Sequence, residues 1–258
     1  MGQPKMKKNQ KKNNAKVSYK KGRGLVSDGN SSVSSVNMRK QFDVEIEVMS
    51  PLHLNSGKAN VNIDSDIVHD AMGVPYFPAK RLRGLLYESA VELWEMVACT
   101  DKAFSSQLIE ELFNRVENSS VTLLIHDFHL DEGADYQKKV EEWAYLSDKY
   151  PEIVTQESVL KQYTSIRFRT RINPETGTAA DMSLRNVRVL DAGKKFIGKI
   201  EILGANEQHL ALLELALFNL TRAGMNRNRG LGHIRCSILK KGNSDVANML
   251  KKLREVNQ

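Results

Sequence analysis

The segment 225–236 carries the residue types best suited to binding a phosphate chain. Its centre reads Arg227-Asn228-Arg229-Gly230-Leu231-Gly232. Glycine allows the backbone to approach a ligand closely, and each arginine presents a planar fork that fits phosphate or carboxylate groups. Backbone N–H groups in such a segment add further donors for phosphate oxygens. A solvated turn with charges beside it has the same composition, so the motif by itself leaves both interpretations open.

Three aspartates and a histidine lie in the irregular segment 51–79, where they could carry metal or acid–base chemistry. Asp64, Asp66 and Asp70 are loop carboxylates. Such groups either ligate a divalent ion such as Mg²⁺ or cap turns, and the residues alone favour the second role. His53 has the pKa of a general base. Because leucines flank it on both sides, a partly buried ring bonded to the backbone is an equally good interpretation.

Two further groups of basic residues have positions that suit RNA. Lys80, Arg81 and Arg83 begin a predicted helix, whose N-terminal N–H groups also attract phosphate. Arg169 and Arg171 lie two residues apart on a predicted strand, so both point to one side of it and would line an RNA groove. A solvated charged surface is the other interpretation of both groups.

The formal net charge of +7 is unevenly distributed along the 258 residues. Residues 1–40 carry 11 basic and one acidic side chain, a net charge of +10, so the rest, with 27 basic and 30 acidic, has −3. A nucleic-acid site in the folded part must therefore be a local basic patch. Cys99 and Cys236, the only cysteines, exclude a disulfide scaffold and a four-cysteine zinc site. We expect both to be buried free thiols.

Composition also divides the chain. Residues 1–40 are rich in Lys, Asn and Gln, then in Gly and Ser, so we predict a disordered basic tail followed by a folded domain at 41–258. No apolar run approaches the length of a membrane span, and the N-terminus lacks the apolar core of a secretory signal. We therefore expect a cytoplasmic protein without membrane association.

Hydrophobic periodicity predicts the α+β domain that must position the candidate residues. Apolar and acidic residues alternate from Phe42 to Val48, a pattern typical of a half-buried strand. With insertions left aside, the predicted elements are strand 42–50, helix 80–98, strand 121–130, strand 196–203, helix 206–222 and strand 233–239. This is the βαββαβ order of ferredoxin-like and RNA-recognition folds. The central strands lack the aromatic pairs with which a recognition sheet stacks bases, so binding through the sheet face is not expected.

Two long segments interrupt this order. The first is the loop 51–79 after the first strand. The second is an insertion at about 131–190, in which a helix is predicted around 136–146 and a hairpin with arms 166–172 and 184–190. The sequence Asn173-Pro-Glu-Thr-Gly-Thr between the arms is a strong turn signal.

Several stretches of the chain together resemble a known family. They are Leu52-His-Leu-Asn-Ser-Gly, Ile63-Asp-Ser-Asp-Ile-Val-His-Asp, Gly73-Val-Pro-Tyr-Phe-Pro, Leu82-Arg-Gly-Leu-Leu and Asn228-Arg-Gly-Leu-Gly-His. In this order and spacing, over roughly residues 42–240, they resemble the RAMP superfamily of CRISPR-associated proteins, most closely the backbone subunit repeated along type III interference complexes. The chain departs from the family in its long basic tail and in Ala79-Lys80-Arg81, where small residues are common.

The resemblance implies a ferredoxin-like palm with an inserted thumb at 166–190 that presses between bases of a guide–target duplex. It implies that the helix start and the glycine-rich loop hold CRISPR RNA, that His53 faces RNA, and that Asp64 serves cleavage of paired target RNA, with Mg²⁺ as the candidate cofactor. Copies would associate along the guide beside other effector subunits. The residues expected to bind RNA are His53, Lys80, Arg81, Arg83, Arg169, Arg171, Arg227, Asn228, Arg229, Gly230 and Gly232.

Two alternatives to a target-cleaving subunit stay open from the sequence. One is a non-catalytic, RNA-binding structural subunit of the same complex. The other is the metal-independent endonuclease that matures CRISPR RNA from its precursor, which typically uses a histidine, here His53. The register of Asp64 and the insertion 131–190 weigh against the second alternative. Catalytic activity, expected as endoribonuclease activity, is thus left uncertain by the sequence.

Overall fold

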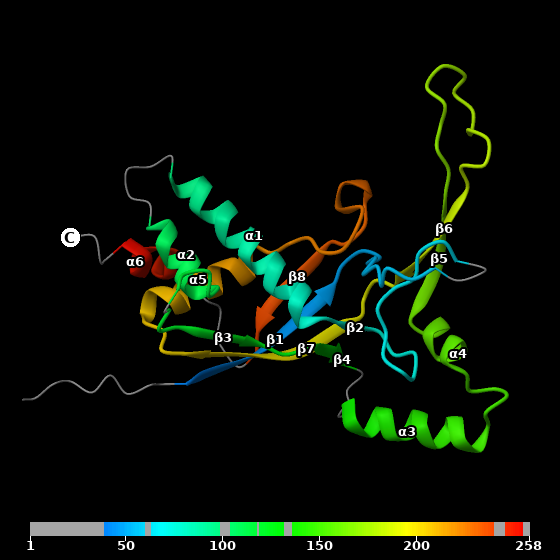
Figure 1. Cartoon of the computed structure of the whole chain (residues 1–258), viewed down its shortest axis with the longest axis horizontal. Coiled ribbons are helices and arrows are strands. Elements are labelled where there is room, and N and C mark those ends of the chain that lie inside the picture. The colour runs from blue at the N-terminus through cyan, green and yellow to red at the C-terminus, as the bar shows by residue number, and fades with distance from the viewer. Residues whose placement is uncertain are drawn as a thin grey trace, which may run out of the picture. The chain divides into compact units, whose positions relative to one another are not determined.

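The computed structural model describes residues 39–59, 63–98, 104–117, 119–131, 136–239 and 246–254. The tail predicted to be disordered lies outside these ranges except for its last two residues, and Cys99 also lies outside them. The predicted mixture of helices and antiparallel strands is confirmed (Figure 1).

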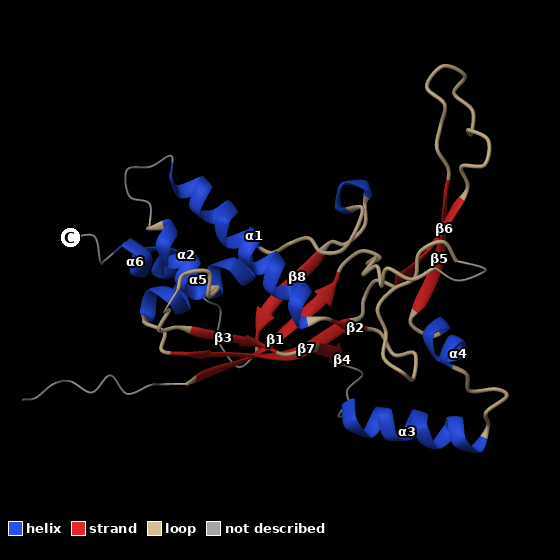
Figure 2. Ribbon diagram, in the orientation of Figure 1, coloured by secondary structure: helices blue, strands red, loops and turns tan. Residues whose placement is uncertain are grey.

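An antiparallel sheet forms the base on which the other elements are built (Figure 2). Its strands are β1 (Lys40–Val48), β2 (Tyr76–Phe77), β3 (Thr122–Ile125), β4 (Phe128–Leu130), β7 (Lys195–Leu203) and β8 (Ile234–Ile238). Across the sheet the order is β2-β4-β7-β1-β8, and β3 also pairs with β7. Every one of these pairings is antiparallel. β1 and β8 therefore lie side by side, and their antiparallel pairing brings the segment that follows β1 together with the segment that precedes β8.

The sheet is apolar on one face only, as the alternation in its first strand predicted. Val44, Ile46 and Val48 of β1 are fully buried, whereas the acidic residues between them lie on the other face. There Glu45 pairs with Lys195 at 3.1 Å and Glu47 pairs with Arg235 at 3.5 Å across neighbouring strands. Such exposed cross-strand pairs contribute little free energy, so burial of the apolar face carries the stability of the sheet.

Two helices lie over the apolar face and two more pack against them (Figures 1 and 2). They are α1 (Ala79–Ala98), α2 (Ser106–Leu112), α5 (Glu207–Asn219) and α6 (Val246–Arg254). α5 is buried on nearly all sides because it contacts α1, α2, α6 and β8. It ends at Asn219, three residues before the predicted end, and Leu220 is already extended. The chain then pairs Arg222 with His233, which closes the glycine- and arginine-rich segment into a loop.

The predicted strand 121–130 is broken by a β-bulge. Ile125 pairs with Ile200 and His129 with Ile197, so four steps along one strand match three along the other. One extra residue reverses the side-chain alternation. As a result Leu123 and Phe128 both face the core. The ring of Phe128 lies against Gly198, where an added Cβ would be 2.3 Å from the ring.

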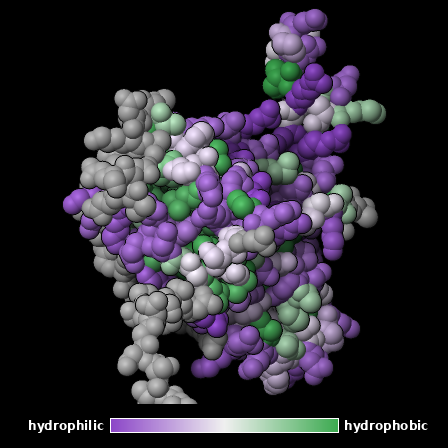
Figure 3. Space-filling model, turned by 60° about the vertical axis from the view of Figure 1, so that its left-hand side comes forward, coloured by the Kyte–Doolittle hydropathy of each residue, from purple (hydrophilic) through white to green (hydrophobic). Residues whose placement is uncertain are grey.

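The insertion contains two helices and a separate two-stranded sheet. Its elements are α3 (Tyr136–Lys149), α4 (Gln156–Lys161), β5 (Thr164–Arg169) and β6 (Arg185–Leu190). β5 and β6 pair in antiparallel register as the predicted hairpin arms, and the chain between them projects beyond the paired region (Figure 1). The surface of this projection is mostly hydrophilic (Figure 3), although Ile172, Met182 and Leu184 are exposed on it.

Candidate nucleic-acid interface

Backbone hydrogen bonds join the loop after β1 to the glycine- and arginine-rich loop before β8. Gly232 N–H donates to Pro51 O at 2.9 Å, and Met225 N–H donates to His53 O at 2.9 Å. The two segments are far apart in sequence, but one follows β1 and the other precedes β8. Because these strands are antiparallel neighbours, the sheet places the two segments side by side. We call residues 222–233 the Gly-Arg loop. The predicted RNA-binding motifs at both ends of the chain thus share one surface.

Two of the three glycines in the Gly-Arg loop, Gly230 and Gly232, have different roles. Both have left-handed backbones, with φ of +78° at Gly230 and +75° at Gly232. At Gly232 a Cβ would lie 1.9 Å from Ala223 O, whereas at Gly230 nothing lies within 4 Å. Gly232 is buried, so its close approach is to the chain itself and the predicted contact with RNA is wrong for this residue. Gly230 is exposed, and its contact with RNA stays a prediction.

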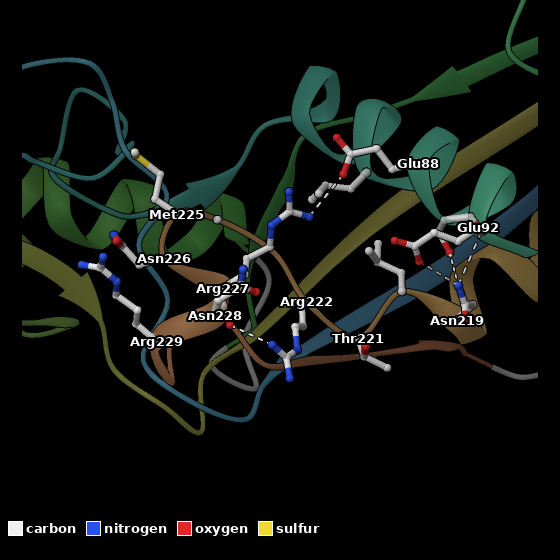
Figure 4. Close-up of a pocket in the computed structure, with 14 residues that line it drawn as sticks. Glu88, Glu92, Asn219, Thr221, Arg222, Met225, Asn226, Arg227, Asn228 and Arg229 are labelled. Carbon is white, nitrogen blue, oxygen red and sulfur yellow. Dashed lines mark hydrogen bonds and ion pairs between the residues drawn. The ribbon is translucent and has the colours of Figure 1, made fainter.

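The arginines of this loop lie on the surface beside α1 (Figure 4). Arg227 and Arg229 flank the exposed Asn228 in a short 3-10 turn, Arg227–Arg229. The Arg227 guanidinium lies 3.2 Å from the Glu88 carboxylate of α1, and Arg222 donates to Arg227 O at 2.9 Å. A surface pocket of about 880 Å³ runs between α1 and this loop. The exposed cations at the rim of this pocket form a local basic patch on a domain that is otherwise nearly neutral. The charge distribution predicted that a nucleic-acid site would be such a patch.

A second, adjoining pocket of about 450 Å³ reaches the loop after β1. It shares Leu85, Glu88, Gly224 and Met225 with the first pocket and is lined further by residues 53–57, Lys80 and Arg81. Lys80 is exposed, and Arg81 donates to Asn55 O. Lys80 and Arg81 therefore lie at the surface that was predicted, and Arg81 also fixes the loop.

The hairpin base approaches the same surface. Partial burial, and after it the nearby Arg229 guanidinium, lowers the pKa of Arg169. Arg169 lies directly opposite Arg185 on the paired strand, a like-charge arrangement that an anion between them would relieve. Arg171, by contrast, is exposed farther along the hairpin. Arg169 and Arg229 thus come together from segments 60 residues apart, as the predicted RNA groove requires.

Two predictions about the start of α1 are wrong. Arg83 does not face the pockets: its guanidinium donates to Leu123 O at 2.8 Å and to Phe113 O at 2.7 Å, which are acceptors inside the domain. Burial lowers the pKa of Arg83, with a smaller effect from Arg115. The helix N-terminus is not free for phosphate either, because the Asp127 carboxylate accepts from Ala79 N–H at 2.7 Å. Asp127 lies in the bulge between β3 and β4, which no sequence pattern indicated.

Asp64 is half-exposed on an extended segment that runs along β6. Its N–H donates to the side-chain oxygen of Asn186 at 2.9 Å, and its Oδ2 accepts from Asn186 N–H at 2.8 Å. Oδ1 lies 3.7 Å from the Arg185 guanidinium. The side chain of Asp64 is 41% exposed, so one carboxylate oxygen remains accessible to a ligand.

The other two loop carboxylates serve the fold, as the residues alone had favoured. Asp66 is buried and lies 3.0 Å from Nε of Arg188. Asp70 accepts from Met72 N–H and Val74 N–H, both at 2.9 Å, and from the Tyr136 hydroxyl at 3.0 Å. Burial, together with this bond to Asp70, raises the pKa of Tyr136 to about 12.

His53 is buried and fully bonded. Its ring is 1% exposed, Nδ1 donates to Arg188 O at 2.7 Å, and Nε2 lies 3.1 Å from the Ser65 hydroxyl. Burial lowers the pKa of His53, and this effect outweighs the hydrogen bond to Arg188 O, which raises the pKa. The predicted contact of the His53 side chain with RNA is therefore wrong for this structure, and the alternative of a buried ring bonded to the backbone is confirmed.

Asp64 is the residue of this surface that was predicted to hold a metal ion. No three His, Cys, Asp or Glu side chains come together as metal ligands would in the part of the chain that the structure describes. Mg²⁺ is commonly held by one or two carboxylates together with substrate phosphates and waters. Asp64 fits an ion bridged to bound RNA in this way and does not fit a site preformed by protein ligands.

Sequence reasoning missed the partners that hold Asp64 and its neighbours. Asn186, Arg185 and Arg188 all come from β6, which lies more than 120 residues later. One signal was available: Arg188 interrupts the apolar run from Val187 to Leu190, and a charge in such a run indicates a buried, paired side chain.

A sequence model of the RAMP superfamily matches residues 45–235. Because the match spans most of the chain, the chain belongs to the RAMP superfamily, and the resemblance drawn from its motifs is confirmed.

Solved structures agree with this assignment at the level of the fold. One similar chain comes from a cryo-EM structure of the type III-B Cmr-beta bound to cognate target RNA, and another from the apo state of Cmr-beta. Both have a TM-score of 0.52 and 14% sequence identity. The matches cover 81% and 78% of this chain, and 98% of each similar chain. No curated protein matches the chain. Within the described ranges, no helix is both long and apolar enough to cross a membrane.

Proposed function

We propose that this chain is a CRISPR RNA-binding subunit of a type III effector ribonucleoprotein that cleaves guide-paired target RNA at Asp64. The observation that carries the proposal is the connection of three motifs on one surface. Asp64 adjoins Ser65, Ser65 bonds His53, and His53 O accepts from Met225 of the Gly-Arg loop. An accessible carboxylate is thereby held at a fixed place beside an arginine-rich surface.

The fold supports a palm and thumb arrangement. Antiparallel strand pairing with β1 between β7 and β8, and with β3 and β4 on the far side of β7, is the arrangement expected for a ferredoxin-like βαββαβ palm. The β5–β6 hairpin takes the place of the thumb. Its like-charged pair Arg169 and Arg185 favours a position beside nucleic-acid phosphates.

The guide RNA lies, in this proposal, along the pockets between α1 and the Gly-Arg loop. Arg227, Arg229, Arg81 and Lys80 contact its phosphates, with Asn228 and the exposed backbone at Gly230. Contacts to the backbone position the guide without reading its sequence, which base pairing with the target then supplies. Copies of the chain associate along the guide beside other effector subunits.

Cleavage uses the 2′-hydroxyl of the target RNA as nucleophile. Its oxygen attacks the adjacent phosphorus, the bond to the 5′-oxygen breaks, and a proton passes from the 2′-oxygen to the leaving 5′-oxygen. Asp64 orients the reacting groups, and Mg²⁺ bound to Asp64 and the RNA would neutralise charge on the phosphate. Arg185, beside Asp64, adds a further positive charge.

The two other candidate functions have unequal support. A non-catalytic RNA-binding subunit has the same Gly-Arg loop, and the single carboxylate at Asp64 is compatible with it. Precursor processing through His53 has little support, because that ring is buried and both nitrogens are bonded.

The experiment is Asp64→Ala in the assembled complex, with cleavage of a guide-paired target measured in single turnover. We expect the rate to fall at least about 100-fold while guide binding is unchanged, because the group that aligns the reaction is lost. Asp148→Ala, which removes an exposed carboxylate from α3, is the matched control and should cleave at the wild-type rate. Cleavage at the wild-type rate by the Asp64→Ala complex would show that Asp64 takes no part in the reaction and would favour the non-catalytic RNA-binding subunit.

A further inference from the structure

Arg188 of β6 is a charged side chain with only 1% of its surface exposed. Its guanidinium contacts three separate segments. Nε lies 3.0 Å from Asp66 of the loop after β1, Nη2 donates to Glu157 of α4 at 2.7 Å, and Nη1 donates to Thr164 of β5 at 3.2 Å. Desolvation makes a buried ion pair a weak source of stability compared with apolar packing, so this cluster calls for another explanation.

The backbone of Arg188 holds the same loop from a second direction. Arg188 N–H donates to Ser65 O at 3.0 Å, and Arg188 O accepts from His53 Nδ1 at 2.7 Å. The other ring nitrogen of His53 lies 3.1 Å from the Ser65 hydroxyl. Ser65, between Asp64 and Asp66, is therefore fixed through both its backbone and its side chain.

This arrangement decides which way Asp64 points. Residues 64–66 run beside β6, with Ser65 bridged to Val187 in parallel, so Asp64 meets Asn186 and Asp66 meets Arg188. Asp66 points inward to Arg188, with 9% of its side chain exposed, and Asp64 points outward, with 41% exposed. Asp64 and Asp66 are two positions apart, so a slip of one residue would bring Ser65 to the place of one of them and take both carboxylates from these partners. The ion pair between Asp66 and Arg188 opposes such a slip, because the slip would leave the buried guanidinium without the Asp66 carboxylate.

We propose that Arg188 is a positioning residue for target cleavage: with Asp66 it locks the register of residues 63–67 on β6 and holds the Asp64 carboxylate toward the RNA. This inference rests on the proposed role of Asp64 and adds the group that sets its orientation. Displacement of a reacting group by about 1 Å can slow a reaction about 100-fold. Arg188 therefore acts on the rate without touching the substrate.

The test uses the assembled complex and single-turnover cleavage at saturating target. Arg188→Gln removes the charge but keeps a polar side chain, and we expect the cleavage rate to fall about 10- to 100-fold with guide and target affinity unchanged. Asp66→Asn, an isosteric change at the other end of the pair, should lower the rate similarly. Arg188→Lys keeps the charge and should recover part of the rate. In an Asp64→Ala background, Arg188→Gln should have no further effect.

A control separates positioning from general destabilisation. His209→Gln removes a buried polar side chain from α5. In the wild type, Nε2 of His209 lies 3.4 Å from the Glu111 carboxylate of α2. It should lower the melting temperature but leave cleavage per folded complex unchanged, and amide exchange of residues 63–67 should accelerate only in Arg188→Gln and Asp66→Asn. If Arg188→Gln does not fold, the Asp66→Asn rate decides.

The outcomes distinguish the inference from the proposed function. Wild-type cleavage by a folded Arg188→Gln or Asp66→Asn complex, when Asp64→Ala is inactive, overturns the positioning role alone. Wild-type cleavage by Asp64→Ala overturns the proposed cleavage at Asp64 and the positioning role together.

Discussion

The loops that follow β1 and α5 use their charged residues in opposite ways. In residues 63–67, Asp66 is buried against Arg188 and Asp64 is bonded on one side to Asn186. In the Gly-Arg loop the charged side chains are exposed, and Arg227 has an exposed ion pair with Glu88. The first loop is built to fix one carboxylate, whereas the second presents a positive field to an extended ligand.

This difference teaches how one surface can combine positioning with binding. Buried pairs are expensive to break, so they set geometry, while exposed cations exchange partners easily and attract phosphates at a distance. The predictions below change one loop and ask whether the other responds.

The largest effect on stability is expected in the backbone of the Gly-Arg loop. Gly232→Ala should lower the free energy of unfolding by about 3 kcal/mol, because a left-handed alanine is strained and its Cβ would collide with Ala223 O. Gly230→Ala has nearly the same φ and open space, so about 1 kcal/mol is expected there. Denaturant unfolding of both variants measures the difference. Equal losses would show that the close approach at Gly232 does not constrain the loop.

Removal of the exposed cations should affect binding alone. Arg227→Ala combined with Arg229→Ala should weaken guide RNA binding roughly 100-fold, since two charge-assisted hydrogen bonds are lost. The slope of log K against log salt should become shallower by about 1.4, the value for two contacts to single-stranded RNA. Titrations at several salt concentrations measure both quantities. Unchanged affinity would remove the Gly-Arg loop from the interface.

The loop that holds Asp64 should respond to acid before the Gly-Arg loop does. Burial lowers the pKa of His53 below 6.5, so the unfolded state binds a proton that the native state excludes, and stability is lost as the pH falls below about 6.5. Arg169 and Arg81 oppose protonation of His53, and Asp66 favours it. As the pH falls from 7 to 5, the protection factors of the amides, which correct for the pH dependence of intrinsic exchange, should decrease first in residues 52–59 and 63–67. His53→Gln should remove this difference between the two loops. A simultaneous loss of amide protection in residues 226–231 would contradict this account.

The smallest effect concerns the acidic partner of the Gly-Arg loop. Glu88→Gln frees Arg227 from an exposed ion pair, whose contribution is at most about 1 kcal/mol, and should tighten guide binding about twofold. Glu92→Gln, one helical turn farther along α1, is the matched control, because Glu92 contacts Asn219 and not the loop arginines. An equal gain in both variants would indicate a general field effect instead of competition for Arg227.

The sequence predicted the elements more accurately than the contacts between them. Alternation along β1 and helical periodicity in α1 and α5 gave these elements to within a few residues, because each depends on burial of one face of a local segment. The strand 121–130 was predicted without its bulge, since register depends on the partner strand β7. The same bulge brings Asp127 to the N-terminus of α1, where a phosphate group had been expected.

The exposure of a candidate residue followed the sequence prediction where no other segment covers it. Arg227, Asn228 and Arg229 are exposed as predicted, because nothing in a Gly-rich loop covers them. The prediction failed for Arg83, which donates to Phe113 O, and for Gly232, which is packed against Ala223 O. A long flexible guanidinium binds whichever acceptors the fold presents, and that choice is invisible in a linear pattern.

By itself the sequence determined the family, the one-sided sheet and the concentration of positive charge in residues 1–40, because order, periodicity and charge are properties of the linear chain. Only the tertiary structure decided that Asp64 points outward while Asp66 and His53 are buried. That choice depends on Arg188 and Asn186 from a strand more than 120 residues away, and on the register in which they meet the loop.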